Sequence, residues 1–268
     1  MRRHRALAGG DVHPFYRAIL NRAQVLGYGT PSKACQRLQN TLVKDLVSVG
    51  IWDLLDIFYM NSNDVATDDF HRINWKDPAL FTKTKVSTPV YTVKQGVKAS
   101  ATGYYNTGWT PTTHGVNFTI NSNFFFCYHF NNVANAGLTM GSANTANTAS
   151  VSLRKNLSGT PSIFFCNNSG EFSSVGGSVY NGGYGVQRNN SGSVDIYMNG
   201  SLMTNASPAS AGSVNQAIIE CGRRNSAGAF VNAETNVINS CLAFGAPINQ
   251  NTFGNLIINY ITAVQLLP

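Results

Sequence analysis

The chain has 268 residues, enough for one large domain or for one domain with an appendage. Apolar residues make up 43% of it, so a substantial core is possible, whereas charged residues make up only 12% and Asn, Ser, Thr and Gly supply most of the polarity. This balance is typical of all-β, loop-rich proteins. No apolar stretch approaches the ~20 residues that span a bilayer, so we expect no membrane insertion.

The net charge of +7 is unevenly distributed. Residues 1–100 hold 14 Lys and Arg against 8 Asp and Glu, whereas residues 101–268 hold 5 against 4. The basic excess is densest at Arg2, Arg3 and Arg5. A solvated, flexible tail is one interpretation. We favour a basic arm that docks on a partner through these arginines. No aromatic residues interleave with them, so nucleic acid is not the expected partner.

Three segments are predicted along the chain. Residues 1–29 form the basic N-terminal arm, with a short helix that Pro14 could begin and Gly27 could end. Residues 30–89 form a helical lead-in and a loop that pack on a sandwich. Residues 90–268 form that sandwich and end in a helix.

The lead-in begins with a clear helix signal. Thr30 and Pro31 offer an N-cap followed by a first-turn proline, and Gly50 is a natural stop. Apolar residues recur between them at steps of three and four: Cys35, Leu38, Leu42, Leu46 and Val49. Residues 51–60 then form either a second short helix or a helix that runs into a strand.

Short segments rich in β-branched and aromatic residues, each followed by Asn, Gly or Ser, begin at about Val90. We expect strands at Val90 to Val93, Val116 to Ile120, Asn123 to Phe130, Ala149 to Lys155, Pro161 to Cys166, Gly185 to Arg188, Val194 to Met198, Ser201 to Thr204, Ala217 to Cys221 and Val237 to Phe244. Strands at this spacing without helices between them predict a mainly β fold, an antiparallel sandwich or jelly roll.

The clearest local signals lie near the end of the chain. Asn199-Gly200 separates two alternating segments and predicts a hairpin with a type I′ turn. The chain then ends in a predicted helix capped near Asn249. Its apolar face carries Phe253, Leu256, Ile257, Tyr260, Ile261 and Val264.

The cysteines give no sign of a metal site or of disulfides. They are odd in number, none shares a CxxC spacing, and each lies in an apolar segment: Cys35, Cys127, Cys166, Cys221 and Cys241. We expect small, buried, reduced side chains. The acidic loop around Asp68-Asp69 lacks the oxygen spacing of a known calcium loop. No metal or other cofactor is therefore expected.

Glycoside hydrolysis needs two carboxylates across the scissile bond. The β region holds only Glu171, Asp195, Glu220 and Glu234, each alone on its segment. Nucleophile elbows, phosphate loops and zinc-protease helices are missing from the sequence. We therefore expect no catalytic residues and no enzyme, with polysaccharide depolymerase as the remaining enzymatic alternative.

A glycine-rich segment, Gly176 to Gly185, is interpreted as turns between strands. Asn181 and Tyr184 within it could hydrogen-bond to and stack on sugars, which makes a glycan-binding lectin the main alternative function. The simpler interpretation is that β-turns require Asn and Gly in any case.

Several motifs together resemble a family of tailed-phage virion proteins, common in phages of Bacteroidetes and related bacteria. They are LGYGTPS (26–32), QNTLVKDLVSVGIWDLLDIFYM (39–60), INWKDPALF (73–81) and GYYNTGWTP (103–111). The similarity covers roughly residues 20–268. In that family the lead-in precedes a concanavalin A-like, laminin-G-type jelly roll, and Leu55, Phe58 and Trp75 are expected to plug the sandwich.

The resemblance implies a non-enzymatic structural component of the virion: a head fibre, a tail fibre or baseplate appendage, or a capsid decoration. Its expected partners are capsid, tail or fibre subunits and further copies of itself, with a host surface glycan as a possible contact. No secretory signal is seen in the first residues, so we expect assembly in the host cytoplasm and a final location in the virion.

Overall fold

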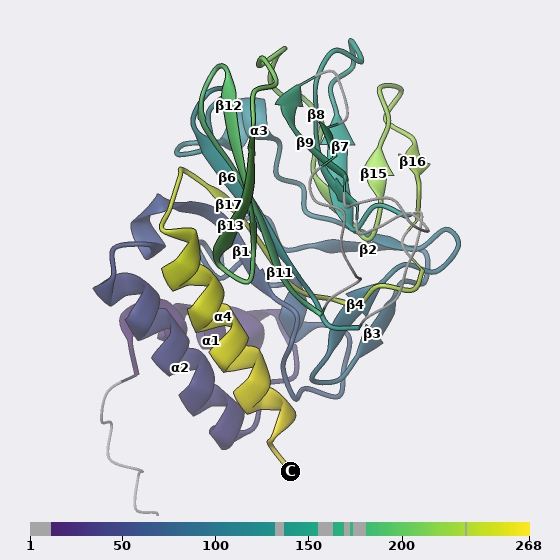
Figure 1. The fold of residues 1–268 in the computed structure, drawn as a ribbon. Coiled ribbons are helices and arrows are strands. Elements are labelled where there is room, and N and C mark those ends of the chain that lie inside the picture. The colour runs from purple at the N-terminus through teal and green to yellow at the C-terminus, as the bar shows by residue number, and fades with distance from the viewer. Residues whose placement is uncertain (1–11, 132–136, 155–162, 169–171, 174–180, 234) are drawn as a thin grey trace, which may run out of the picture.

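The computed structural model describes residues 12–131, 137–154, 163–168, 172–173, 181–233 and 235–268. The described part is mainly β and has three layers (Figure 1). Two β-sheets, here sheet A and sheet B, pack face to face, and helices cover the outer face of sheet A. The predicted mainly β fold with an N-terminal helical segment and a C-terminal helix is confirmed at this level.

In the described part of the chain, sheet A contains eight strands and is antiparallel throughout. From one edge to the other they are β13 (Ser201–Ala206), β12 (Ser193–Met198), β11 (Gly182–Asn190), β6 (Asn123–His129), β17 (Asn239–Gly245), β4 (Gly96–Lys98) and β3 (Val90–Thr92). The eighth, β1 (Leu55–Met60), lies beside β17 on the side opposite β6. All seven residues of β17 are buried, so β17 is the centre of the sheet.

Nine strands of the described residues form sheet B. Their order is β10 (Phe172–Ser173), β9 (Ile163–Asn168), β8 (Ser150–Arg154), β7 (Met140–Ala143), β14 (Ile219–Glu220), β5 (Tyr104–Asn106) and β2 (Thr84–Val86), with β15 (Arg223–Arg224) paired to β7 and β16 (Phe230–Val231) paired to β15. Its pairs are antiparallel except for the short contact between β15 and β7. The sheet as a whole is therefore mixed.

The predicted hairpin is confirmed. Strands β12 and β13 pair antiparallel, and Asn199 and Gly200 both have positive φ angles, 50° and 80°. A type I′ turn requires positive φ at both central residues, and Asn and Gly tolerate it best. The local sequence therefore determines this connection.

Three main helices form the third layer: α1 (Pro14–Leu26), α2 (Lys33–Ser48) and α4 (Gln250–Gln265). Each has a side-chain N-cap, from His13, Ser32 and Asn249 respectively, and α1 ends at Gly27 with a positive φ. Shorter helical turns are η1 (Trp52–Leu54), η2 (Phe70–Arg72) and α3 (Pro111–His114). The segment expected as an arm thus contains α1, whose Tyr16 and Ile19 are buried.

Sheet A separates two apolar cores, because successive strand residues point to opposite faces. In β6, Phe125 and Cys127 belong to the core between the sheets, whereas Phe124 and Phe126 belong to the core under the helices. Phe253 of α4 lies among the aromatic rings on the helix side, with centroid distances of 5.0 Å to Phe126 and 5.8 Å to Phe124. It ties the C-terminal helix to the sheet.

Several sequence-based expectations need correction. Leu55, Phe58 and Trp75 do not plug the space between the sheets, because they lie in the core under the helices. Residues 51–60 form the turn η1 and then strand β1, so the second of the two alternatives for this segment, a helix that runs into a strand, is confirmed. The expected strand at 116–120 is absent, because Val116, Asn117 and Phe118 donate their backbone N–H groups to the Asp56 carboxylate.

Phe253→Ala should lower the free energy of unfolding by about 3–5 kcal/mol, because it leaves a cavity among packed rings. The measurement is chemical denaturation followed by tryptophan fluorescence. Asn255→Ala, on an exposed position of the same helix, is the control and should change the stability little. Equal midpoints for the two variants would contradict this role of Phe253.

Candidate functional site

Of the residues singled out from the sequence, the structure describes Asn181 and Tyr184. Arg2, Arg3 and Arg5 lie outside the described residues. Asn181 is exposed, immediately before β11. Tyr184, expected in a glycan-facing loop, lies within β11, is 5% exposed, and packs in the core between the sheets with its ring 4.9 Å from that of His129. The loop prediction for Tyr184 is therefore wrong.

A buried polar cluster joins the residue after β1, the residue before β2 and a residue of β14. Lys83 Nζ donates to Asn61 Oδ1 and to Glu220 Oε2, both at 2.7 Å. Asn61 Nδ2 in turn donates to Glu220 Oε1 at 2.6 Å. All three residues have exposed fractions of 0%. We call them the Lys83–Asn61–Glu220 triad.

Each member of the triad is held by its backbone. Asn61 follows β1, and its N–H donates to Ser240 O of β17 at 2.9 Å. Lys83 precedes β2, and its N–H donates to Arg72 O at 2.8 Å. Glu220 is in β14, where it pairs with Tyr105 of β5. Asn61 thus comes from sheet A, whereas Lys83 and Glu220 come from the side of sheet B.

Two aromatic rings enclose the ammonium group. Lys83 Nζ lies 4.8 Å from the ring centroid of Tyr59 and 5.2 Å from that of Tyr105. Both tyrosines are buried. Ring faces attract a cation electrostatically, and here they also keep water away from the ion pair.

A second polar cluster continues from Tyr105. Its hydroxyl donates to Asp68 Oδ1 at 2.5 Å, His71 Nε2 lies 2.7 Å from the same oxygen, and Lys85 donates to Asp68 Oδ2. Burial alone would raise the pKa of Asp68, but these three bonds outweigh it and hold the pKa well below its usual value. Burial lowers the pKa of His71 to about 3, even though Asp68 opposes the shift. His71 is therefore neutral at pH 7.

The five cysteines are free and buried, as expected. Burial raises the pKa of the Cys35 and Cys166 thiols to about 12. Burial, together with the nearby Glu220 charge, also raises the pKa of Cys127 and Cys241 well above the usual value. These thiols remain protonated and behave as small core residues.

Among the described residues, no group of three or more His, Cys, Asp and Glu is arranged to hold a metal ion. In the same part of the chain, no helix has the length and apolar character needed to cross a membrane. Of the four carboxylates noted in the β region, Glu171 and Glu234 lie outside the described residues. Glu220 is fully buried in the triad, and Asp195 accepts hydrogen bonds from Asn189 and Asn205.

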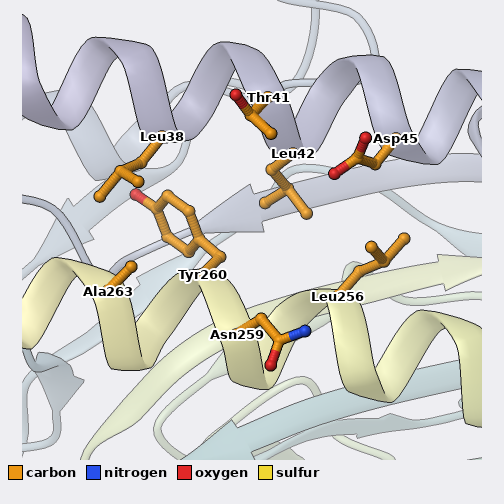
Figure 2. Close-up of a pocket in the computed structure, with 8 residues that line it drawn as sticks. All are labelled: Leu38, Thr41, Leu42, Asp45, Leu256, Asn259, Tyr260 and Ala263. Atoms are coloured by element: carbon orange, nitrogen blue, oxygen red, sulfur yellow. The ribbon is translucent and has the colours of Figure 1, made fainter.

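An open groove of about 180 Å³ runs between α2 and α4 (Figure 2). Its walls are largely apolar, and Tyr260, whose hydroxyl donates to Ser62 O at 2.8 Å, lies at the contact between the helices. Asp45 is the one carboxylate among its lining residues. The groove therefore lacks the pair of acid and base groups that hydrolysis requires.

A stacked aromatic pair lies on sheet B. The rings of Tyr104 in β5 and Phe230 in β16 are 4.4 Å apart with an interplanar angle of 20°. Both residues are partly exposed. Tyr105, the next residue of β5, points into the interior, so Tyr104 points to the outer face of the sheet. Arg224 is the cross-strand partner of Phe230 and shares its face.

No family model and no curated protein match the chain. Several solved structures are similar to it. A sialidase mutant of Trypanosoma rangeli with trans-sialidase activity has a TM-score of 0.52 at 10% identity, covering 84% of this chain and 39% of that one. Domain 4 of AbnA, an extracellular GH43 arabinanase of Geobacillus stearothermophilus, in complex with arabinotriose, has a TM-score of 0.50 at 11% identity, covering 76% and 98%.

The receptor-binding domain of a botulinum neurotoxin C/D mosaic serotype is also similar, with a TM-score of 0.48 at 14% identity, covering 78% and 51%. The chain spans about two fifths of the sialidase chains that it matches. Identities this low show the fold alone. They place the chain among β-sandwich domains.

The expectation that the chain is not an enzyme is corrected by these structures. A fold of this kind occurs in a sialidase chain and in a domain of an arabinanase. Carboxylates that are scattered along a sequence do not report their spacing in space, so the missing motif was no ground for excluding a glycosidase.

The triad was missed from the sequence. Its one local signal is Glu220, a charged residue inside the apolar segment AIIEC. A strand with this sequence would be buried on both faces, so the side chain of Glu220 would be buried whichever face it is on. Asn61 and Lys83 carry no such signal. Their partner is 159 and 137 residues away, respectively.

The neutral, buried His71 predicts a loss of stability in acid. Its pKa is about 3 in the folded chain and about 6.5 when unfolded. The unfolded state therefore binds the extra proton first, and stability should fall as the pH drops from about 6.5 towards 4, by up to about 1.4 kcal/mol per pH unit. Urea denaturation at several pH values measures this slope.

His71→Gln keeps a side-chain amide donor for Asp68 but cannot titrate, so its stability should change less over the same range. His114→Gln, outside the cluster, is the matched control and should retain the slope of the unaltered chain. An unaltered slope in His71→Gln would show that other groups carry the acid sensitivity.

Proposed function

We propose that the chain is a component of a tailed-phage particle whose concanavalin-like, laminin-G-type sandwich contacts carbohydrate on the host surface. The main observation in support of carbohydrate binding is the stacked, partly exposed Tyr104–Phe230 pair on the outer face of sheet B. Sugar-binding sites combine aromatic faces with a few fixed polar groups.

The pair is held in place by its surroundings. A Cβ added at Gly222 would meet the Phe230 ring at 2.1 Å, so the ring lies directly on the backbone there. Tyr104 is fixed by strand pairing with Val86 of β2. Two rings that are fixed in this way lose little side-chain entropy when a ligand binds.

Polar groups accompany the rings. Arg224 lies beside Phe230 and donates from Nη1 to Gly228 O at 2.9 Å, which orients its guanidinium group. Its remaining N–H groups suit sugar hydroxyl oxygens. The arabinotriose complex of the arabinanase domain, which this chain covers almost completely, supports an oligosaccharide as the ligand class.

The particle part of the proposal is supported by the family resemblance of residues 20–268 and by the concentration of basic residues at the front of the chain. The free edge of sheet A adds support. Among the described strands, β13 has no outer neighbour in sheet A, and it exposes Leu202 (57%) and Met203 (36%). Unprotected edges with apolar side chains pair readily with another chain. We propose virion subunits, including further copies of this chain, as the partners.

Tyr104→Ala and Phe230→Ala should each weaken glycan binding by about tenfold or more, because a platform ring is typically worth more than 1 kcal/mol. A glycan array identifies a ligand among host capsular and surface polysaccharides, and calorimetry then measures its affinity. Tyr197→Ala, at a partly buried tyrosine of β12 in sheet A, is the matched control.

If Tyr104→Ala and Phe230→Ala both keep the glycan affinity of the unaltered chain, the glycan does not bind at this pair. The same samples should be assayed for new reducing ends. Their appearance would identify hydrolysis, the depolymerase alternative, in place of binding alone.

Removing residues 1–11 should release the protein from particles and leave its thermal unfolding unchanged, because α1 begins only at Pro14. Occupancy on purified particles is measured by quantitative mass spectrometry. Replacing Arg2, Arg3 and Arg5 by Ser in the full chain tests their charge directly. Normal occupancy of the truncated protein would contradict attachment through the arm.

A further inference from the structure

The triad places a primary amine, a carboxamide and a carboxylate in mutual contact. Lys83 Nζ is 2.7 Å from Asn61 Oδ1. Because a C=O bond is about 1.2 Å long, Nζ lies no more than about 4 Å from the carbonyl carbon Cγ. This approaches the separation of about 3–3.5 Å at which bound groups react. The nucleophile and the electrophile are therefore already together in the folded chain.

We propose that Lys83 and Asn61 join in an intramolecular isopeptide bond, which the folded chain forms by itself with Glu220 as the acid–base catalyst. Glu220 is suited to this role because its two oxygens contact the two reacting nitrogens. Oε2 accepts from Lys83 Nζ at 2.7 Å, and Oε1 accepts from Asn61 Nδ2 at 2.6 Å. It can take a proton from one nitrogen and deliver it to the other.

The reaction is balanced without a co-reactant. The Lys83 ammonium passes one proton to the Glu220 carboxylate, which leaves both groups neutral. The freed electron pair of Nζ forms a bond to Cγ of Asn61, and the C=O electrons move to Oδ1. As the carbonyl re-forms, the Cγ–Nδ2 bond breaks. Glu220 gives its proton to Nδ2 and takes the second proton from Nζ. The products are the secondary amide, ammonia and a neutral Glu220.

The surroundings favour this sequence of steps. Burying an ammonium and a carboxylate costs several kcal/mol per ion in desolvation, and proton transfer within the pair removes both charges. The rings of Tyr59 and Tyr105 flank Nζ and exclude water that would solvate the cation. After the reaction, an amide and a neutral acid occupy the buried site.

A second lysine–amide contact shows what the triad adds. Lys33 Nζ lies 3.2 Å from Gln36 Oε1, but this pair is exposed on α2 and no carboxylate contacts it in the described structure. Lys85 is two residues from Lys83, yet its ammonium group pairs with Asp68. Among the described residues, Lys83 alone combines full burial, an amide and a carboxylate.

The bond would tie the two sheets together. Asn61 directly follows β1 of sheet A, and Lys83 directly precedes β2 of sheet B. The two residues are 22 apart in sequence, so the link closes a loop that includes η2 and Trp75. A link of this kind restricts the unfolded chain in the same way as a disulfide.

Intact-mass spectrometry of the purified, denatured full-length chain tests the proposal. The bond releases ammonia, so the mass should be about 17 Da below that calculated from the sequence. Trypsin cuts after Arg72 and Lys76, so peptides 45–72 and 77–85 should appear as one branched species, uncut after Lys83. Tandem mass spectrometry then locates the link.

Lys83→Met and Glu220→Gln should show the full calculated mass, whereas the matched control Lys85→Met should keep the deficit. The branched peptide of the unaltered chain decides the question even if the variants fail to fold. The proposal is overturned if that chain has the full mass and yields separate peptides after prolonged incubation, or if the deficit occurs without the branch.

Discussion

The constraint on which this structure depends is that sheet A is buried on both faces. Every residue of β17 is inaccessible, with β6 on one side and β1 on the other. A strand in this position must supply apolar side chains to two cores at once. The helices are therefore no appendage to the sandwich. Without α1, α2 and α4, the rings of Phe58, Phe124 and Phe126 would face water.

The same arrangement fixes the position of the polar triad. β1 leaves sheet A immediately before Asn61, whose backbone still pairs with Ser240 of β17. The side chain then enters the space between the sheets, where Glu220 and Lys83 arrive from the other side. Water has no access there, so these groups satisfy one another, and Asn61 also donates to Asn239 O at 3.0 Å. Polar groups in an interior must be paired in this way.

Features set by neighbours in the sequence could be predicted, and features set by distant partners could not. The turn at Asn199-Gly200 and the helix cap at Asn249 depend on a few adjacent residues, and both are found. The cap predicted at Thr30 is wrong by two residues, because Ser32 caps α2. The strand expected at 116–120 does not form, because backbone N–H groups of this segment donate hydrogen bonds to the carboxylate of Asp56, about sixty residues away. No periodicity in the local sequence contains that information.

The glycine-rich segment shows a different limit. Glycine normally indicates a turn, yet residues 182–185 lie inside β11. A Cβ at Gly183 would meet the Phe126 ring at 2.4 Å, and one at Gly185 would meet Gln250 at 2.3 Å. These glycines make room for side chains from β6 and α4. The glycines beside Tyr184 therefore indicate a loop in the sequence, although Tyr184 packs between the sheets.

The triad also raises the question of why a β-sandwich would bury charged side chains at a place where apolar side chains could fill the core. Replacing a buried ion pair by apolar residues of similar size is often neutral or stabilising, whereas removing one partner alone costs about 3–5 kcal/mol. Stability alone therefore gives no reason for Lys83 and Glu220. The proposed reaction does give a reason for them, because a buried amine in contact with an amide and a carboxylate is positioned for bond formation. In the proposed role on a particle surface, a covalent link between the two sheets would keep the layers together even when the packing between them is disturbed.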